Sequence, residues 1–145
     1  MILKLKITRP GAKIPTYGTP GSAAADLYAC LEAPVTLAPG ETAVITLGFA
    51  AAVPEGYVGL VFARSGLATK SDLAPANKVG VVDSDYRGEW MVPMHNHGAV
   101  PRTIEHGLRI AQVAVVPVAR VDFEETEELD GTSRGDGGFG STGRS

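Results

Sequence analysis

The fold is decided by the stretch VGVVDSDYRGEWMVPM at residues 79–94. It holds an apolar segment, Val79–Val82, then turn-forming residues at Asp85–Gly88, then a second apolar segment, Glu89–Met94. Short β-branched segments separated by Gly, Pro, Asn and Asp are typical of strands joined by tight turns. The stretch therefore predicts two short strands and hairpin-type turn chemistry between them.

The same pattern continues on both sides of this stretch. The chain opens with Met1–Arg9, in which Leu3, Leu5 and Ile7 alternate with polar residues, as in a half-buried strand. The 145 residues include 18 Gly and 10 Pro, which leaves little room for long helices. We expect an all-β sandwich, jelly roll or barrel, with further strands at Thr42–Phe49, Tyr57–Phe62 and Ile110–Val118.

One short helix is expected, over Gly66–Ser71, with Ser65 as its N-cap. The tripeptide Arg64-Ser65-Gly66 at its start has two interpretations. It forms an anion site, in which free N–H groups and the Arg64 guanidinium bind negative charge, or it is a capped turn with a solvated arginine. The tripeptide alone favours the second.

The end of the chain differs in composition from the rest. Residues 1–121 are interpreted as the β domain, 122–130 as an acidic linker and 131–145 as a Gly-rich lid. Phe139 is flanked by glycines and suits stacking on a flat ring, while Arg134 with Gly, Ser and Thr groups suits phosphate oxygens. The segment is interpreted as a lid that orders over a nucleoside triphosphate, and the alternative is a solvated end.

Asp83 stands where the apolar segment Val79–Val82 ends. A partly shielded carboxylate there would accept a proton from water as a general base. The alternative is a solvated acid on a surface hairpin, and the sequence does not separate the two.

Composition and charge narrow the class of protein. A net charge of −3 gives no electrostatic reason to expect nucleic acid as a partner. The single cysteine, Cys30, makes no internal disulfide or cysteine zinc site. His95 and His97 share a strand face but lack an evident third metal ligand. No apolar run has the length of a membrane span and no signal-peptide stretch opens the chain, so we expect a cytoplasmic protein.

Five segments, in this order, resemble the trimeric dUTPase (deoxyuridine 5'-triphosphate nucleotidohydrolase) family: Ser22–Ala29, Arg64–Ala68, Gly80–Gly88, Arg109–Gln112 and Arg134–Gly143. The resemblance implies a jelly-roll-like β domain with a flexible C-terminal arm. It also implies a homotrimer whose active sites lie between subunits and are closed by a neighbour's tail. The implied reaction is dUTP + water → dUMP + pyrophosphate with Mg²⁺, which keeps uracil out of DNA and supplies dUMP.

The resemblance also implies a role for each site residue. Asp83 is the general base, and Tyr86 packs on the deoxyribose and excludes a 2′-hydroxyl. A hairpin from Asn77 to Met91 reads uracil largely through main-chain groups. The remaining uracil-binding residues are Gly80, Val81 and Val82; the phosphate-binding residues are Arg64, Ser65, Gly66 and Gln112; the tail residues are Arg134, Phe139, Gly140, Ser141 and Thr142.

Two further expectations concern the metal and the departures from the family pattern. Asp26 touches the water shell of Mg²⁺ without being a direct ligand, because the triphosphate holds the ion. Ala63 replaces a usual Pro, and Leu108 replaces a usual acid before Arg109, so Arg109 is left out of the site.

Three alternatives remain open. A dCTP deaminase-like enzyme of the same fold, in some cases bifunctional, would need an acid/base group aimed at C4 of cytosine. A regulatory protein would use the nucleotide site as a sensor for a partner. A structural jelly-roll oligomer would not call for Arg134 and Phe139 in a flexible end.

Overall fold

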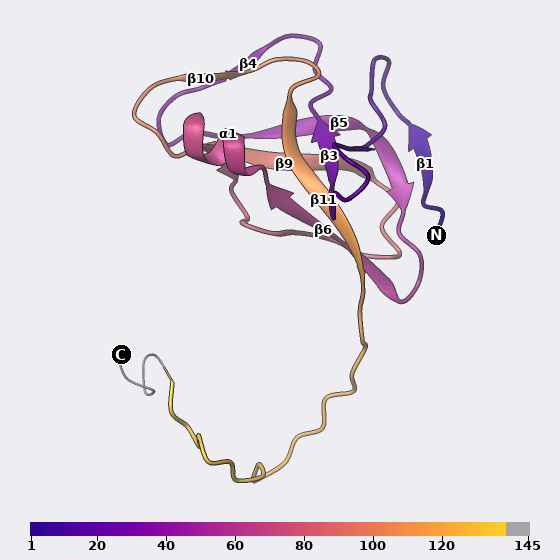
Figure 1. Cartoon of the computed structure of the whole chain (residues 1–145), viewed down its shortest axis with the longest axis vertical. Helices are drawn as coiled ribbons and strands as arrows, with labels where there is room; N and C mark the ends of the chain where they lie inside the picture. The colour runs from indigo at the N-terminus through magenta and orange to yellow at the C-terminus, as the bar shows by residue number, and fades with distance from the viewer. Residues whose placement is uncertain (139–145) are drawn as a thin grey trace.

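The computed structural model of the chain describes residues 1–138, and Figure 1 shows strands packed in layers with one short helix at their side. The expected all-β jelly-roll class is confirmed. In chain order the elements are β1 Lys4–Ile7, β2 Thr16–Tyr17, β3 Ala25–Tyr28, β4 Val35–Leu37, β5 Thr42–Ala52, β6 Tyr57–Ala63, α1 Ser65–Lys70, β7 Leu73–Pro75, β8 Gly80–Val82, β9 Glu89–Asn96, β10 Arg102–Ile104 and β11 Arg109–Pro117.

The described strands form two main antiparallel sheets. One has the order β1-β5-β9-β7, the other has the order β2-β3-β11-β6-β8, and β10 pairs with β4 in a small third sheet. The apolar side chains of both main sheets meet between them, where Leu27, Phe49 and Ile110 are fully buried. Phe49 packs on Trp90 of β9 with ring centroids 5.4 Å apart, so Trp90 belongs to the core.

The strand register of the five-stranded sheet fixes which residues point inward. Val113 of β11 pairs with Val61 of β6 and with Ala25 of β3, and all three are buried. The next row pairs Gln112 with Phe62 and Asp26. Because successive side chains of a strand point to opposite faces, this second row lies on the outer face of the sheet.

The expected hairpin at residues 77–91 differs in its strand pairing: its base is formed by β7 and β9, which pair antiparallel up to the Ala76 N–H that donates to the Pro93 carbonyl at 2.7 Å. β8 pairs with β6, whereas β9 pairs with β5 and β7 in the other sheet. The connection therefore crosses between the sheets, and its turn lies at Asp83–Tyr86, where the Tyr86 N–H donates to the Asp83 carbonyl at 3.2 Å. A Cβ at Gly80 would lie 3.2 Å from the Val61 Cβ, so the close approach of β8 to β6 depends on glycine.

The expected N-cap is also wrong. Helix α1 begins at Ser65 itself, and Arg64 occupies the cap position in extended backbone, with no side-chain cap hydrogen bond. The reason is that β6 continues to Ala63, one residue beyond its expected end, so the chain turns at Arg64. The strands β5 and β9 also run past their expected ends, to Ala52 and Asn96.

After β11 the chain leaves the sheets. The Val118 N–H donates to the Gly56 carbonyl at 2.9 Å, and from there to residue 138 the backbone runs away from the strands, as Figure 1 shows. Phe123 and Leu129 in this segment are 94% and 88% exposed. Among residues 1–138, none of the helical structure has the length and apolar character to cross a membrane.

Candidate functional site

A cavity of 230 Å³ opens between β6 and β8 of one main sheet and β5 and β9 of the other, and we call it the inter-sheet cavity. Seven residues expected in the site line it: Asn77, Gly80, Val81, Val82, Asp83, Tyr86 and Met91. Its other walls are mainly apolar residues of β5, β6 and β9. An apolar hollow with a few polar groups at its rim suits a small flat ligand.

Asp83 lies at the turn that leaves β8, where it lines this cavity and is exposed to solvent. The expectation that the apolar segment shields its carboxylate is therefore wrong for the isolated chain. The reason is that β8 is the last strand of its sheet, so the chain reaches the surface as the strand ends.

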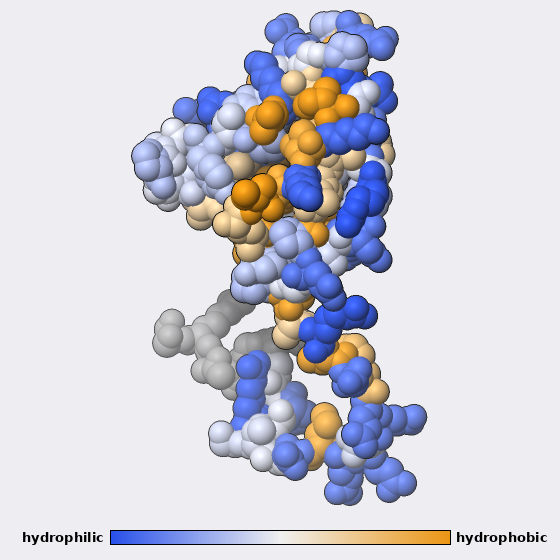
Figure 2. Space-filling view, turned by 90° about the vertical axis from the view of Figure 1, so that its right-hand side faces the viewer, coloured by the Kyte–Doolittle hydropathy of each residue, from blue (hydrophilic) through white to orange (hydrophobic). Residues whose placement is uncertain are grey.

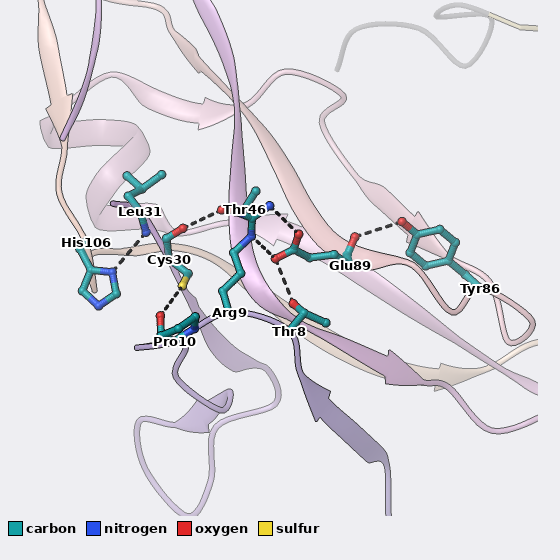
Figure 3. Close-up of polar contacts among 9 residues, drawn as sticks. All are labelled: Thr8, Arg9, Pro10, Cys30, Leu31, Thr46, Tyr86, Glu89 and His106. Carbon is teal, nitrogen blue, oxygen red and sulfur yellow. Dashed lines mark hydrogen bonds and ion pairs between the residues drawn. The ribbon is translucent and has the colours of Figure 1, made fainter. Parts of the chain in front are cut away.

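Tyr86 is held at the rim of the inter-sheet cavity from two sides. Its hydroxyl donates to the Glu89 carbonyl oxygen at 3.0 Å (Figure 3). A Cβ at Gly88 would lie 2.6 Å from the Tyr86 Cζ, so the ring rests on a backbone position that has no side chain. Tyr86 as a whole is 41% exposed and is free to contact a ligand.

A second hollow, which we call the cationic cavity, has a volume of 630 Å³ and lies over β3, β6 and β11. Asp26 accepts hydrogen bonds from Arg64 Nε at 2.7 Å and from Arg109 Nη1 at 3.0 Å. The Asp26 side chain is only 13% exposed, whereas Arg64 and Arg109 are 26% and 50% exposed. Two guanidinium groups around one carboxylate leave a positive site that suits an anion with several oxygens.

The other expected phosphate-binding residues also lie in the cationic cavity. Ser65, Gly66 and Gln112 line it together with Arg64. A Cβ at Gly66 would meet nothing within 4 Å, so no packing within the described chain requires a glycine there. Gln112 Nε2 donates to the Ala63 carbonyl at 2.9 Å and keeps a second N–H for a ligand.

Arg109 is the site residue that sequence reasoning missed. It was set aside because Leu108 precedes it in place of an acid. The structure supplies the acid from another strand, because β3 lies beside β11 and brings Asp26 to Arg109. Sequence spacing carries no signal for such a cross-strand partner.

The two cavities lie on opposite sides of β6. Val61 lines the inter-sheet cavity, and its neighbour Phe62 lines the cationic cavity. Adjacent residues of a strand point to opposite faces. A single chain therefore places Asp83 and Tyr86 on one side of the sheet and Arg64 on the other.

The described residues contain no group of three or more His, Cys, Asp or Glu side chains able to hold a metal ion. The rings of His95 and His97 lie edge to face, 4.4 Å apart, and His95 Nδ1 is 2.8 Å from the Thr42 hydroxyl. Desolvation and the neighbouring His95 and Lys78 hold the pKa of His97 below its ordinary value. The two rings, one in β9 and one just after its end, therefore pack on each other, and the described residues supply no third ligand for a metal.

Cys30 is a buried thiol. Its Sγ lies 3.6 Å from the Pro10 carbonyl oxygen, and burial raises its pKa. A thiol held in its neutral form is a poor nucleophile, so Cys30 packs rather than reacts.

Of the expected tail residues, the structure describes Arg134. Its side chain is exposed, and its Nε donates to the Gly137 carbonyl at 2.8 Å, away from both cavities. The other expected tail residues, Phe139, Gly140, Ser141 and Thr142, lie outside the described residues.

The chain is similar in sequence to a known protein family and to several of its members. The family model for dUTPase matches residues 11–143. A deoxyuridine 5'-triphosphate nucleotidohydrolase of Desulfitobacterium hafniense (strain DSM 10664 / DCB-2) is 51% identical over 132 residues, covering 90% of this chain and 87% of that protein. One of the same description from Bordetella avium (strain 197N) is 44% identical over 144 residues, covering 99% and 97%.

Solved structures of similar shape point the same way. A mutant of the Staphylococcus bacteriophage 80alpha dUTPase with dUpNHpp matches at a TM-score of 0.91 and 28% identity, covering 99% of both chains. A mutant dUTPase from phage phi11 of S. aureus, described with a structural Mg(II) ion, matches at 0.82 and 24% identity over 90% of this chain and 100% of that one. The second likeness supports the fold alone.

Proposed function

Because this chain belongs to the dUTPase family and is an enzyme that hydrolyses dUTP, we propose that Asp83 is its general base and that the inter-sheet cavity binds the deoxyuridine part of the substrate. The observation that carries this assignment is that Asp83 and Tyr86 line one small cavity with Asn77, Gly80 and Met91. A cavity of 230 Å³ suits a nucleobase with part of its sugar.

In the proposed reaction, the Asp83 carboxylate accepts a proton from a water molecule. The water oxygen then bonds to the α-phosphorus, and the bond from that phosphorus to the oxygen bridging to the β-phosphate breaks. Pyrophosphate leaves and dUMP remains. Asp83 is exposed, so its carboxylate is open to water, as a base requires.

Recognition of uracil is assigned to the main chain of β8. In the described part of the chain, β8 has a strand partner only on the side of β6, so its outer edge keeps free N–H and C=O groups. Uracil presents an N–H between two carbonyl oxygens, a pattern that such an edge matches and that cytosine does not. Close packing of the same segment leaves no room for the methyl group of thymine.

The triphosphate is assigned to a cationic cavity of a second subunit. Arg64, Ser65, Gly66 and Gln112 bind its oxygens, and Arg109 joins them. Since β6 separates the two cavities of one chain, a substrate that contacts both kinds needs two chains. The opposite-face arrangement therefore supports a homotrimer with shared sites, which is the assembly typical of the family.

An apolar groove beside β1 supports the same assembly. It has a volume of 480 Å³ and is lined by Leu3, Leu5, Phe49 and Val113 among others. Figure 2 looks onto the side where β1 lies in Figure 1 and shows apolar side chains gathered there. Ile14 in this groove is 62% exposed and Met1 is 77% exposed, as expected of a surface that another subunit covers.

The tail and the metal complete the proposal. The lid at residues 131–145 reaches a neighbour's site, where Arg134, Ser141 and Thr142 bind the γ-phosphate and Phe139 stacks on uracil. The described residues offer no metal cage, and both Asp26 oxygens accept from arginines, which fits an ion held by the triphosphate with Asp26 reaching it through water. When bound, Mg²⁺ offsets the charge of the triphosphate and orients the α-phosphate.

The test is pyrophosphate release from dUTP, dTTP, dCTP and UTP, each with Mg²⁺ and with EDTA, for the wild type and Asp83→Asn. We expect release from dUTP alone, dependent on Mg²⁺, and its loss in Asp83→Asn with dUTP binding retained. Near-normal turnover by Asp83→Asn would remove Asp83 from the mechanism. Conversion of dCTP to uracil nucleotides would instead indicate the deaminase alternative.

A further inference from the structure

We propose that Arg9 and Glu89 are positioning residues that set the discrimination between deoxyribose and ribose substrates, because their ion pair fixes the carbonyl group that holds Tyr86. The proposal rests on the role proposed above for Tyr86, whose ring excludes a 2′-hydroxyl. We call the two side chains and their hydrogen bonds the Arg9–Glu89 latch, and Figure 3 shows it.

The latch joins the end of β1 to the start of β9. Arg9 Nε lies 2.7 Å from Glu89 Oε1 and Arg9 Nη2 lies 3.0 Å from Oε2, so the guanidinium grips both carboxylate oxygens. The Thr8 hydroxyl donates to Oε1 at 3.0 Å. The Glu89 side chain is 18% exposed. Three donors in a fixed arrangement make this pair more directional than a single surface ion pair.

The latch rests on a rigid part of the core. The N–H groups of Thr8 and Arg9 both donate to the Gly48 carbonyl oxygen, at 2.8 and 3.2 Å. Gly48 has φ +74°, and a Cβ there would lie 2.6 Å from Cys30 Sγ, so only glycine fits at this point without strain. Gly48 lies where the register between β5 and β9 shifts, just before Ala50 pairs with Glu89. The latch therefore binds β9 at its first residue, next to the shift in its register with β5.

The start of β9 also orients Tyr86. The Tyr86 hydroxyl donates to the main-chain carbonyl of Glu89, and its ring covers Gly88. The side-chain hydrogen bonds of Arg87, to the carbonyls of Ser84 and Tyr86, stay within the connection itself. The hydrogen bond from the Tyr86 side chain to the sheet is therefore made to Glu89. The side chain of Glu89 is itself bound by Arg9 and Thr8. A shift of Glu89 moves the ring that limits space for the sugar.

The test compares kcat/KM for dUTP and UTP in Glu89→Gln and Arg9→Met. We expect the dUTP/UTP ratio to fall by about tenfold in each, since rejection of an added hydroxyl by a pocket is worth only about a hundredfold in total. The change appears mainly as a gain with UTP, while kcat for dUTP stays within about threefold because Asp83 is untouched. Arg9→Lys keeps the charge and one of the donors, so its dUTP/UTP ratio should lie between those of Arg9→Met and the wild type.

Asp72→Asn is the matched control. It also replaces an acid by its amide within an ion pair, here with Arg102 at 2.8 Å, and its neighbour Leu73 pairs with Asn96 at the far end of β9. Thermal unfolding of all variants separates loss of fold from loss of selectivity. If Glu89→Gln does not fold, Arg9→Met and Thr8→Val decide the question.

The outcomes separate this inference from the proposed function. A wild type without dUTP hydrolysis, or Tyr86→Ala with unchanged selectivity, overturns the function assigned to the cavity. If Tyr86→Ala relaxes selectivity but folded Glu89→Gln and Arg9→Met keep the wild-type ratio, the latch is overturned and the proposed function stands. An equal loss of selectivity in Asp72→Asn also overturns it, because the effect would then be one of general stability.

Discussion

Mixing two inactive variants should restore activity, because the proposed base Asp83 and the proposed phosphate-binding residue Arg64 line cavities on opposite sides of one sheet. Asp83→Asn removes the proposed base from the inter-sheet cavity, and Arg64→Gln removes a cationic group from the other cavity. Each change alone is expected to leave roughly 1% of the wild-type turnover or less, as for loss of a general base or of one charge-stabilising donor. Glutamine at position 64 keeps an N–H near Asp26, which limits the cost to folding.

The recovery follows from counting subunits. If each site takes Asp83 from one subunit and Arg64 from another, equal amounts of the two variants assembled at random give about one intact site in four. The refolded mixture should therefore reach about a quarter of the wild-type turnover, at least roughly twenty-five-fold above either variant alone. If both residues of a site came from the same chain, every site would carry one change and mixing would restore nothing.

The assay is pyrophosphate release after the two variants are unfolded together and refolded, compared with each variant treated alone. Asp83→Asn mixed with the double variant Asp83→Asn/Arg64→Gln is the matched control, because that mixture contains no intact base and should stay inactive. Size-exclusion chromatography with light scattering confirms that trimers have formed. Mixed trimers with no more activity than their parents would refute the reasoning from opposite faces.

Three further predictions can be checked with the same assays. Deleting residues 131–145 should leave the melting temperature unchanged and lower turnover about a hundredfold, since precise closure is worth that much; a truncation that unfolds, or keeps full turnover, would contradict the lid. Gly88→Ala should raise kcat/KM for UTP, because its Cβ would displace the Tyr86 ring, and an unchanged dUTP/UTP ratio would show that the ring keeps its place. Hydrogen bonding by Arg9 holds the pKa of Glu89 below its ordinary 4.5. The stability contributed by Glu89 is therefore present above pH 4.5 and lost as the pH falls through the lowered pKa. Melting curves of Glu89→Gln at acidic pH should lack this part of the decrease in melting temperature.

The sequence predicted those features of the fold that depend on local pattern. Alternation and turn residues placed β5, β6, β9 and β11 close to their observed bounds, because a half-buried strand and a tight turn each leave a direct mark on composition. The strand pairing expected within residues 77–91 was wrong, because local pattern does not report which strands pair. Both apolar segments around Asp83 are strands, but a strand's partner depends on packing with distant residues, such as the contact of Gly80 with Val61.

The candidate site shows the same division. The residues around Asp83 are consecutive or nearly so, and one cavity gathers them. Arg109 was missed because its partner Asp26 lies 83 positions away in the chain. The Arg9–Glu89 latch, with its 80-residue separation, left no trace in any short motif either. Local motifs thus predict most of the proposed ligand contacts, whereas residues whose partners are distant in the sequence emerge only from the tertiary pairing.

Strand alternation also explains why the proposed site needs a second chain. The period of two that buries Val61 and Val113 in the core sends Phe62, Gln112 and Asp26 to the outer face. Charged groups gather on that outer face because the inner one has no water to solvate them. In the proposed function, the uracil ring needs the inter-sheet cavity, whereas the triphosphate needs the outer cations. The proposed trimer reconciles the two demands, because it would place the outer face of one copy against the inter-sheet cavity of another.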